Sequence, residues 1–267
     1  MRTKNVIRLC LLASIGGGLL SALLRTIALL NNYNVESGHF DLGESIHLVD
    51  WSWAVALLVC AACGVACFLF RNRLGGFERV PRTSYIVGAT ALIFTILLTI
   101  FESLSEERIP GTVESSLNMI IAVVGGMSCA TILGNAFIPS NKVNLIRASV
   151  SLVPAIFIVM PGYRSYFDAG LIMNCPNKSV YIIAACFASV MIITECRFNC
   201  PKPSTALFTA SCCATVVTGM FCGIPNIVYF AVNRVPLLSG FGPDFAILGF
   251  AVFAMAQLCS LHHKIDQ

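Results

Sequence analysis

Charged residues are scarce in this sequence. Asp, Glu, Lys and Arg together make up 11% of the chain, whereas hydrophobic residues make up 57%, and the mean hydropathy is +0.83. A soluble domain of 267 residues needs more polar material than this to cover its surface. A soluble globular fold is therefore excluded, and a chain embedded in a lipid bilayer is expected.

Sequence motifs of catalysis and of phosphate binding are also missing. The chain contains no P-loop, no G-x-G-x-x-G, no H-E-x-x-H and no G-x-S-x-G. It has no polar linker long enough to separate domains, so residues 1–267 form a single integral membrane domain. We assign no catalytic residue, metal or cofactor and expect no nucleic-acid partner; the pattern leans against an enzyme without deciding the question.

Eight apolar stretches recur along the chain. Each is about as long as the ~20 residues that an α-helix needs to cross ~30 Å of hydrocarbon. A membrane β-barrel would instead show short segments of alternating hydrophobicity. The sequence therefore predicts an all-α, polytopic transmembrane helical bundle of about eight helices, with spans at about 5–30, 51–70, 85–101, 116–138, 145–160, 180–195, 205–222 and 245–261.

The loops between these stretches alternate in charge. By this assignment, 12 of the 17 basic residues fall on the side of the two termini, and 10 of the 13 acidic residues fall on the other side. Lys and Arg in short loops stay in the cytoplasm, so both termini are predicted to be cytoplasmic. The opposite side keeps five basic residues: Arg25, Arg108, Arg164, Lys178 and Arg234.

The first stretch has two interpretations. A basic start at Arg2, Lys4 and Arg8 followed by an apolar run is also the pattern of a signal peptide. The run is longer than a usual signal sequence, and no A-x-A-like cleavage site follows it. Retention as the first crossing is favoured, and cleavage would leave seven spans.

Small residues at four-residue spacing predict where helices pack closely. Ser14, Gly18 and Ala22 share one face of the first span, and Gly126, Ala130 and Gly134 share one face of the fourth. The 13 cysteines, among them Cys60, Cys63 and Cys67 on one helical face, are interpreted in the same way, as small packing residues.

Polar residues inside a bilayer are costly, so each one needs a partner or a purpose. Arg25 lies at the outer edge of the first span and has two interpretations. It either extends outward to exterior acids such as Glu36 or Asp50, or it binds an anionic group that arrives from outside. The candidate binding residues are Arg25 and the embedded amides Asn118, Asn135, Asn226 and Gln257. Apart from Glu195, the last residue of the sixth, no carboxylate falls inside a predicted span.

Two spans contain interruptions. Pro154 in the fifth span removes one backbone hydrogen bond and predicts a kink. Gly223, Pro225 and Asn226 interrupt the seventh apolar run, which predicts either a helix end or, less favoured, a broken helix of the kind that builds transporter sites.

The exterior loop at 31–50 is rich in acids and histidines, but no known metal-ligand spacing is present. It is interpreted as a solvated loop with a turn at Asn34–Gly38.

Three functions remain open. A small-molecule or ion transporter, or the substrate-binding subunit of one, comes first. A non-transporting sensor, assembly factor or immunity-type protein comes second, and a membrane-embedded lipid-modifying enzyme third.

The expected partners are the lipid bilayer, a small-molecule or ion ligand, and another membrane protein or a second copy of the chain. The expected location is the cell membrane, as a multi-pass protein of a bacterial plasma membrane.

Overall fold

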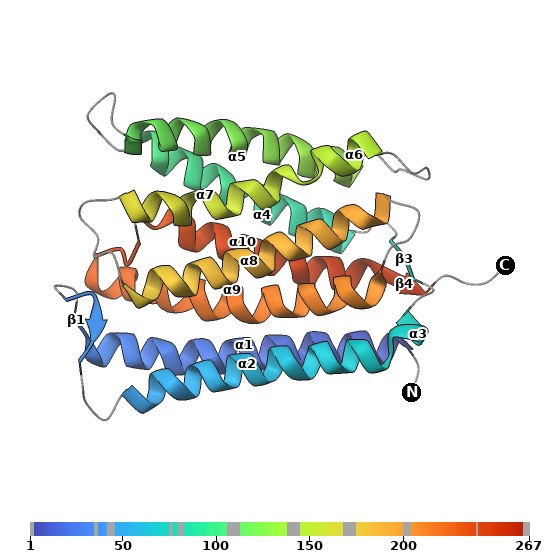
Figure 1. Ribbon diagram of the computed structural model, residues 1–267, viewed down its shortest axis with the longest axis horizontal. Coiled ribbons are helices and arrows are strands. Elements are labelled where there is room, and N and C mark those ends of the chain that lie inside the picture. Colours follow the sequence, from blue (N-terminus) through green and yellow to red (C-terminus); the bar gives the residue numbers. More distant parts are fainter. Residues whose placement is uncertain are drawn as a thin grey trace.

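The structure is a computed structural model that describes residues 3–34, 37–41, 46–74, 77–79, 83–105, 113–137, 145–167, 175–199, 204–238 and 240–263. Long helices account for most of these residues (Figure 1). The elements, in chain order, are α1 (Thr3–Asn32), β1 (Tyr33–Asn34), β2 (His39–Phe40), α2 (Ile46–Leu69), α3 (Arg71–Leu74), β3 (Phe77–Arg79), α4 (Thr83–Ser105), α5 (Val113–Phe137), α6 (Leu145–Val150), α7 (Val153–Phe167), α8 (Pro176–Cys196), the 3₁₀ helix η1 (Arg197–Asn199), α9 (Thr205–Asn233), α10 (Gly242–Ser260) and β4 (Leu261–His263).

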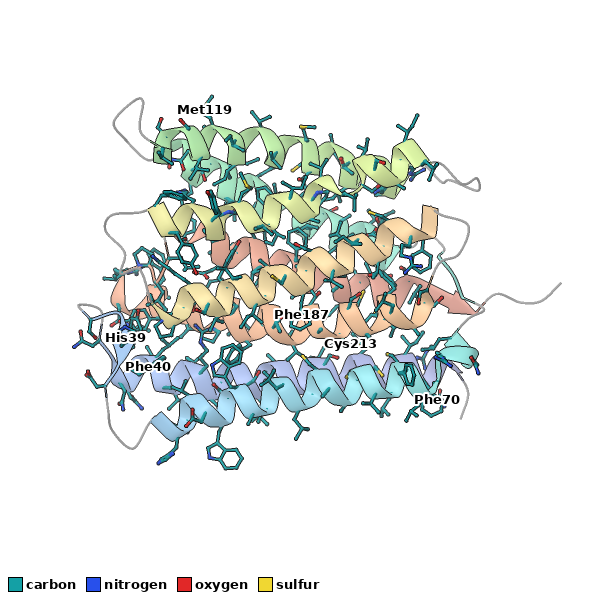
Figure 2. The ribbon with its side chains drawn as sticks, viewed as in Figure 1. His39, Phe40, Phe70, Met119, Phe187 and Cys213 are labelled. Carbon is teal, nitrogen blue, oxygen red and sulfur yellow. The ribbon has the colours of Figure 1, made fainter. Side chains whose placement is uncertain are left out.

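The predicted all-α bundle is confirmed. Within the described residues, eight helical segments are long and apolar enough to cross a membrane, and α6 and α7 together form one of them. Large apolar side chains such as Leu58, Phe101 and Met119 are more than half exposed along the outside of the bundle, and Met119 points away from it in Figure 2. Soluble monomers rarely expose so much apolar surface, whereas lipid tails cover it. These helices indicate a multi-pass membrane protein.

Helix α9 lies at the centre of the bundle. It packs against α1, α2, α8 and α10, and 83% of the residues in its most apolar 18-residue stretch are buried. Helices α1 and α2 cover one side of it, while α4, α5 and α7 lie beyond α8 and α10 on the other side (Figure 1). The core is therefore formed mainly by the last three long helices.

The antiparallel course of the helices gives the bundle two distinct ends. At one end, α1, α4, α7 and α9 finish and α8 and α10 begin; we call it the β1 end, after the β1–β2 hairpin that lies there (Figure 1). At the other, the β4 end, β4 pairs antiparallel with β3 and lies near the start of α1. These short strands were not predicted from the sequence.

The turn expected at Asn34–Gly38 is present between β1 and β2. The N–H of Gly38 donates to the carbonyl of Asn34 at 2.9 Å, and Gly38 has a positive φ of 67°, which glycine adopts at no steric cost. This turn brings Tyr33 opposite Phe40.

The two predicted interruptions have different outcomes. The chain turns at Ser151–Leu152 between α6 and α7, so Pro154 falls in the first turn of α7, where its missing N–H has no helical partner to lose. At Gly223–Asn226, in contrast, no break occurs. Helix α9 continues to Asn233 with Pro225 inside it, which corrects the predicted helix end.

Close packing at the predicted small-residue faces is uneven. Gly18 lies against Met220 and Val217 of α9, and its neighbours Ser14 and Ala22 are buried. The face at Gly126 and Gly134 has no heavy atom within 4 Å of where either Cβ would stand, so no other described part of the chain packs closely against it.

We predict that Gly219→Leu destabilises the bundle and that Gly126→Leu does not. A Cβ at Gly219 would lie 2.8 Å from the Ala251 Cβ and 3.0 Å from the Ile247 carbonyl oxygen, whereas Gly126 faces open space. Overpacking costs about 1–3 kcal/mol, and both variants gain the same helix propensity. Thermal unfolding of the purified proteins in detergent measures the difference; equal melting temperatures would show that α9 and α10 do not pack as described.

Candidate functional site

The β1 end contains an unusual number of buried charges. Among the described residues there, three cations and two carboxylates are each no more than 7% exposed. Buried charges in an apolar bundle are rare and mark binding sites or ion pathways. The five residues are Arg25, Arg164, Lys178, Glu102 and Asp244.

Arg25 of α1 points inward, between α8 and α9. Its Nη1 donates to the carbonyl of Phe221 at 2.7 Å and, less closely, to that of Cys222 at 3.4 Å. Its Nη2 donates to the Oδ1 of Asn177 at 2.5 Å and to the Oδ1 of Asn226 at 3.1 Å. The guanidinium also lies over the Phe221 ring, 5.1 Å from its centroid. All four hydrogen-bond acceptors are uncharged oxygens.

Pro225 explains why a backbone carbonyl is available to Arg25. In an α-helix the N–H of residue 225 would donate to the carbonyl of residue 221, but proline has no N–H. The Phe221 carbonyl therefore has no partner of that kind within α9, and Arg25 supplies the donor instead. The proline that led us to expect a helix end thus positions the arginine.

Asn226 connects Arg25 to a carboxylate. Its Oδ1 accepts from Arg25, and its Nδ2 donates to the Oδ1 of Asp244 at 2.7 Å. Asp244 lies in the first turn of α10, where the positive end of the helix dipole favours a negative charge. The cation and the anion are therefore joined through one amide group.

Asn177 completes what we call the β1-end cluster, which consists of Arg25, Asn177, Asn226 and Asp244. Because arginine has only donors, the Oδ1 of Asn177 must face it, and this leaves the Nδ2 of Asn177 pointing elsewhere. That Nδ2 is buried and has no hydrogen-bond partner at normal distance in the part of the chain that the structure describes, although the Tyr33 hydroxyl is near enough to interact with it. A ligand with an acceptor oxygen would provide one.

The other charges at this end are already engaged. Glu102 of α4 accepts hydrogen bonds from the N–H groups of Phe241 and Gly242, so its carboxylate caps the start of α10. Arg164 of α7 donates to the hydroxyl of Ser103 at 3.3 Å. Lys178 of α8 lies over the ring of Tyr166, with its Nζ 5.3 Å from the centroid.

An apolar group lies one helical turn beyond Arg25 and Asn226. It consists of Leu29, Tyr229 and Leu237, with Tyr33 and Phe40 of the hairpin packed against them; Figure 2 shows Phe40 on this hairpin. Burial raises the pKa of Tyr33, and so does its hydrogen bond with Cys175, so its hydroxyl stays neutral. The β1-end cluster is thus covered on its outer side by this apolar group.

The structure brings together two of the five residues predicted from sequence, Arg25 and Asn226. Asn135, 17 residues along α5 from Asn118, hydrogen-bonds Ser151 and Arg147 beside the turn between α6 and α7, which is a structural role. Asn118 and Gln257 are buried, and in the described residues neither the Oδ1 of Asn118 nor either amide atom of Gln257 has a hydrogen-bond partner. Neither contacts the β1-end cluster through a hydrogen bond.

The prediction that no carboxylate lies inside a span is wrong for Glu102 and Asp244. Both lie within one turn of the end of a predicted span, because the helices in the structure extend further than the predicted spans do. The position of Asp244 in a helix could have been predicted, because Gly242-Pro243-Asp244 contains the proline and the acid that favour the start of a helix. Arg164 and Lys178, predicted in an exterior loop, are also buried in helices.

Metal binding has no support in the described residues. No group of three or more His, Cys, Asp or Glu side chains there is arranged to hold a metal ion. Of the acids and histidines of the loop at 31–50, Glu36 and Glu44 lie outside the described residues.

Comparisons of this chain with models of known protein families, with curated proteins and with solved structures found no match. The function is therefore inferred from the chemistry of the β1-end cluster.

Proposed function

We propose that the protein is a membrane transporter for a small molecule that carries an anionic group, and that Arg25 binds that group. The observation that supports this proposal is the buried guanidinium of Arg25, whose four hydrogen bonds all go to uncharged oxygens. Removing a cation from water costs several kcal/mol, and neutral oxygens offset this cost less than an anion does. A carboxylate or phosphate would add a paired, charge-assisted interaction.

The hydrogen bonds of the two buried carboxylates at the β1 end support the same ligand. Glu102 is bound by backbone N–H groups, and Asp244 shares no hydrogen bond with Arg25 but is joined to it through Asn226. Arg25 therefore keeps the capacity to bind the carboxylate or phosphate of a ligand directly.

Transport is favoured over a non-transporting role by the position of these charges. A span without deeply buried charge would suit a non-transporting protein, whereas Arg25 and Asp244 are both buried in the bundle. A binding residue that sits inside the helices and is covered from one end fits a substrate that passes through the bundle. We further propose that the chain resides in a bacterial plasma membrane with both termini in the cytoplasm, which would make the β1 end the exterior end.

We predict that Arg25→Gln abolishes binding and uptake of the anionic substrate. The probes are acetate, propionate, succinate, inorganic phosphate and L-alanine, tested by thermal shift on the purified protein and then by counterflow uptake into proteoliposomes. Arg25→Lys retains the charge but loses the paired donors, and we expect it to weaken binding by about tenfold, equivalent to about 1.4 kcal/mol.

Arg234→Gln is the matched control, because it removes an exposed positive charge at the same end. It should bind and transport as the unmodified protein does. Equal losses of melting temperature and expression in both Arg25 variants, with ligand affinity unchanged in whatever protein folds, would show that Arg25 is purely structural.

We predict that the two ends of the bundle face opposite sides of the membrane. Epitope tags inserted at 75–76 and after residue 267 should be protected in intact cells, and a tag inserted at 168–174 should be accessible, because the basic loops remain in the cytoplasm. Antibody labelling before and after permeabilisation measures this. A tag at 75–76 that is labelled in intact cells would contradict the orientation.

A further inference from the structure

We infer that the ligand of the β1-end cluster is a zwitterion, with a carboxylate for Arg25 and an ammonium group for Asp244, as in an α-amino acid. This inference rests on the proposed function and names its substrate class.

The cluster presents a cation and an anion at a fixed, short separation. Asn226 spans them, with its Oδ1 3.1 Å from the Nη2 of Arg25 and its Nδ2 2.7 Å from the Oδ1 of Asp244. The two charged groups therefore lie within about 8 Å of each other, the width of one amide group and two hydrogen bonds. None of the three residues is more than 3% exposed.

The amide of Asn226 has the polarity of a small zwitterion. Its partly negative oxygen faces the guanidinium, and its partly positive N–H faces the carboxylate. An α-amino acid has the same arrangement with full charges, a carboxylate at one end and an ammonium one carbon away. Such a ligand can replace the side chain of Asn226 as the bridge, and each neutral contact then becomes a charged one.

Two further observations favour this class. The Nδ2 of Asn177, which makes no hydrogen bond of normal length within the described residues, lies on the side chain that contacts Arg25, so it offers a second donor to a carboxylate bound there. Asp244 also has capacity left, since its Oδ1 accepts one hydrogen bond and its Oδ2 makes none within the described residues. A simple carboxylate would use Arg25 and Asn177 and would leave Asp244 repelling it.

The remaining charges at this end do not offer the same pair. Glu102 has both carboxylate oxygens bound to the N–H groups at the start of α10. Arg164 and Lys178 contact Ser103 and the ring of Tyr166, on α4 and α7. Asp244 is therefore the acid that faces the proposed ligand.

The test compares matched ligands that differ only in the ammonium group. The pairs are L-alanine with propionate, L-leucine with 4-methylpentanoate, and L-phenylalanine with 3-phenylpropionate, which together cover an unknown side-chain size. Binding to the full-length purified protein is measured by thermal shift and by calorimetry at constant pH. In at least one pair, we expect the amino acid to bind more tightly than its deaminated partner by about tenfold or more.

Three variants assign that preference to Asp244. Asp244→Asn should reduce it to less than about threefold, Asp244→Glu should retain it, and the exposed Asp50→Asn at the same end should leave it unchanged. Deaminated acids that bind as tightly as their amino acids, or a preference that survives in Asp244→Asn, would overturn the inference and leave the anion transporter standing. Absence of binding by every pair, while succinate or phosphate binds through Arg25, would overturn it as well. Failure of all anions would instead remove the proposed function.

Discussion

A guanidinium carried into an apolar helix bundle must be met by oxygens, and this requirement organises the β1 end of the molecule. Arg25 obtains its oxygens from two helices, α8 and α9, and the closest backbone one is free because Pro225 lacks an N–H. Asn226, which accepts a hydrogen bond from Arg25, in turn donates one to Asp244 of α10. Four helices are thus fixed relative to one another by one cation, in a setting where apolar side chains gain little from leaving lipid.

The helices were largely predictable because each one appears in the sequence as an apolar stretch of its own. An uninterrupted apolar stretch specifies a span without reference to any other part of the chain. Helix ends were less predictable, because a helix can extend by a turn beyond its apolar stretch where the polar side chains of that turn find partners in the bundle. Asp244 and Lys178 lie in such added turns, and the hydropathy of a single residue carries no information about its partners.

The candidate site could be predicted only in part. Arg25 and Asn226 stand out in the sequence because they are polar residues in apolar runs, but their contact joins residues 201 positions apart, and periodicity indicates a face, not the helix that covers it. Asn135 stands out equally and hydrogen-bonds a residue at a turn between helices. Asn177 gave no signal, because it precedes the predicted span by three residues.

The central position of α9 has a consequence for how the protein is made. A chain leaves the ribosome from its N-terminus, so α1 and α2 are synthesised well before the helix against which both pack. Until α9 has been synthesised, the guanidinium of Arg25 lacks the carbonyls of Phe221 and Cys222 and the amide of Asn226. The partners of an early helix are therefore supplied by a late one, and translation that stops before residue 226 leaves α1 with a charged side chain that has lost three of its four hydrogen bonds.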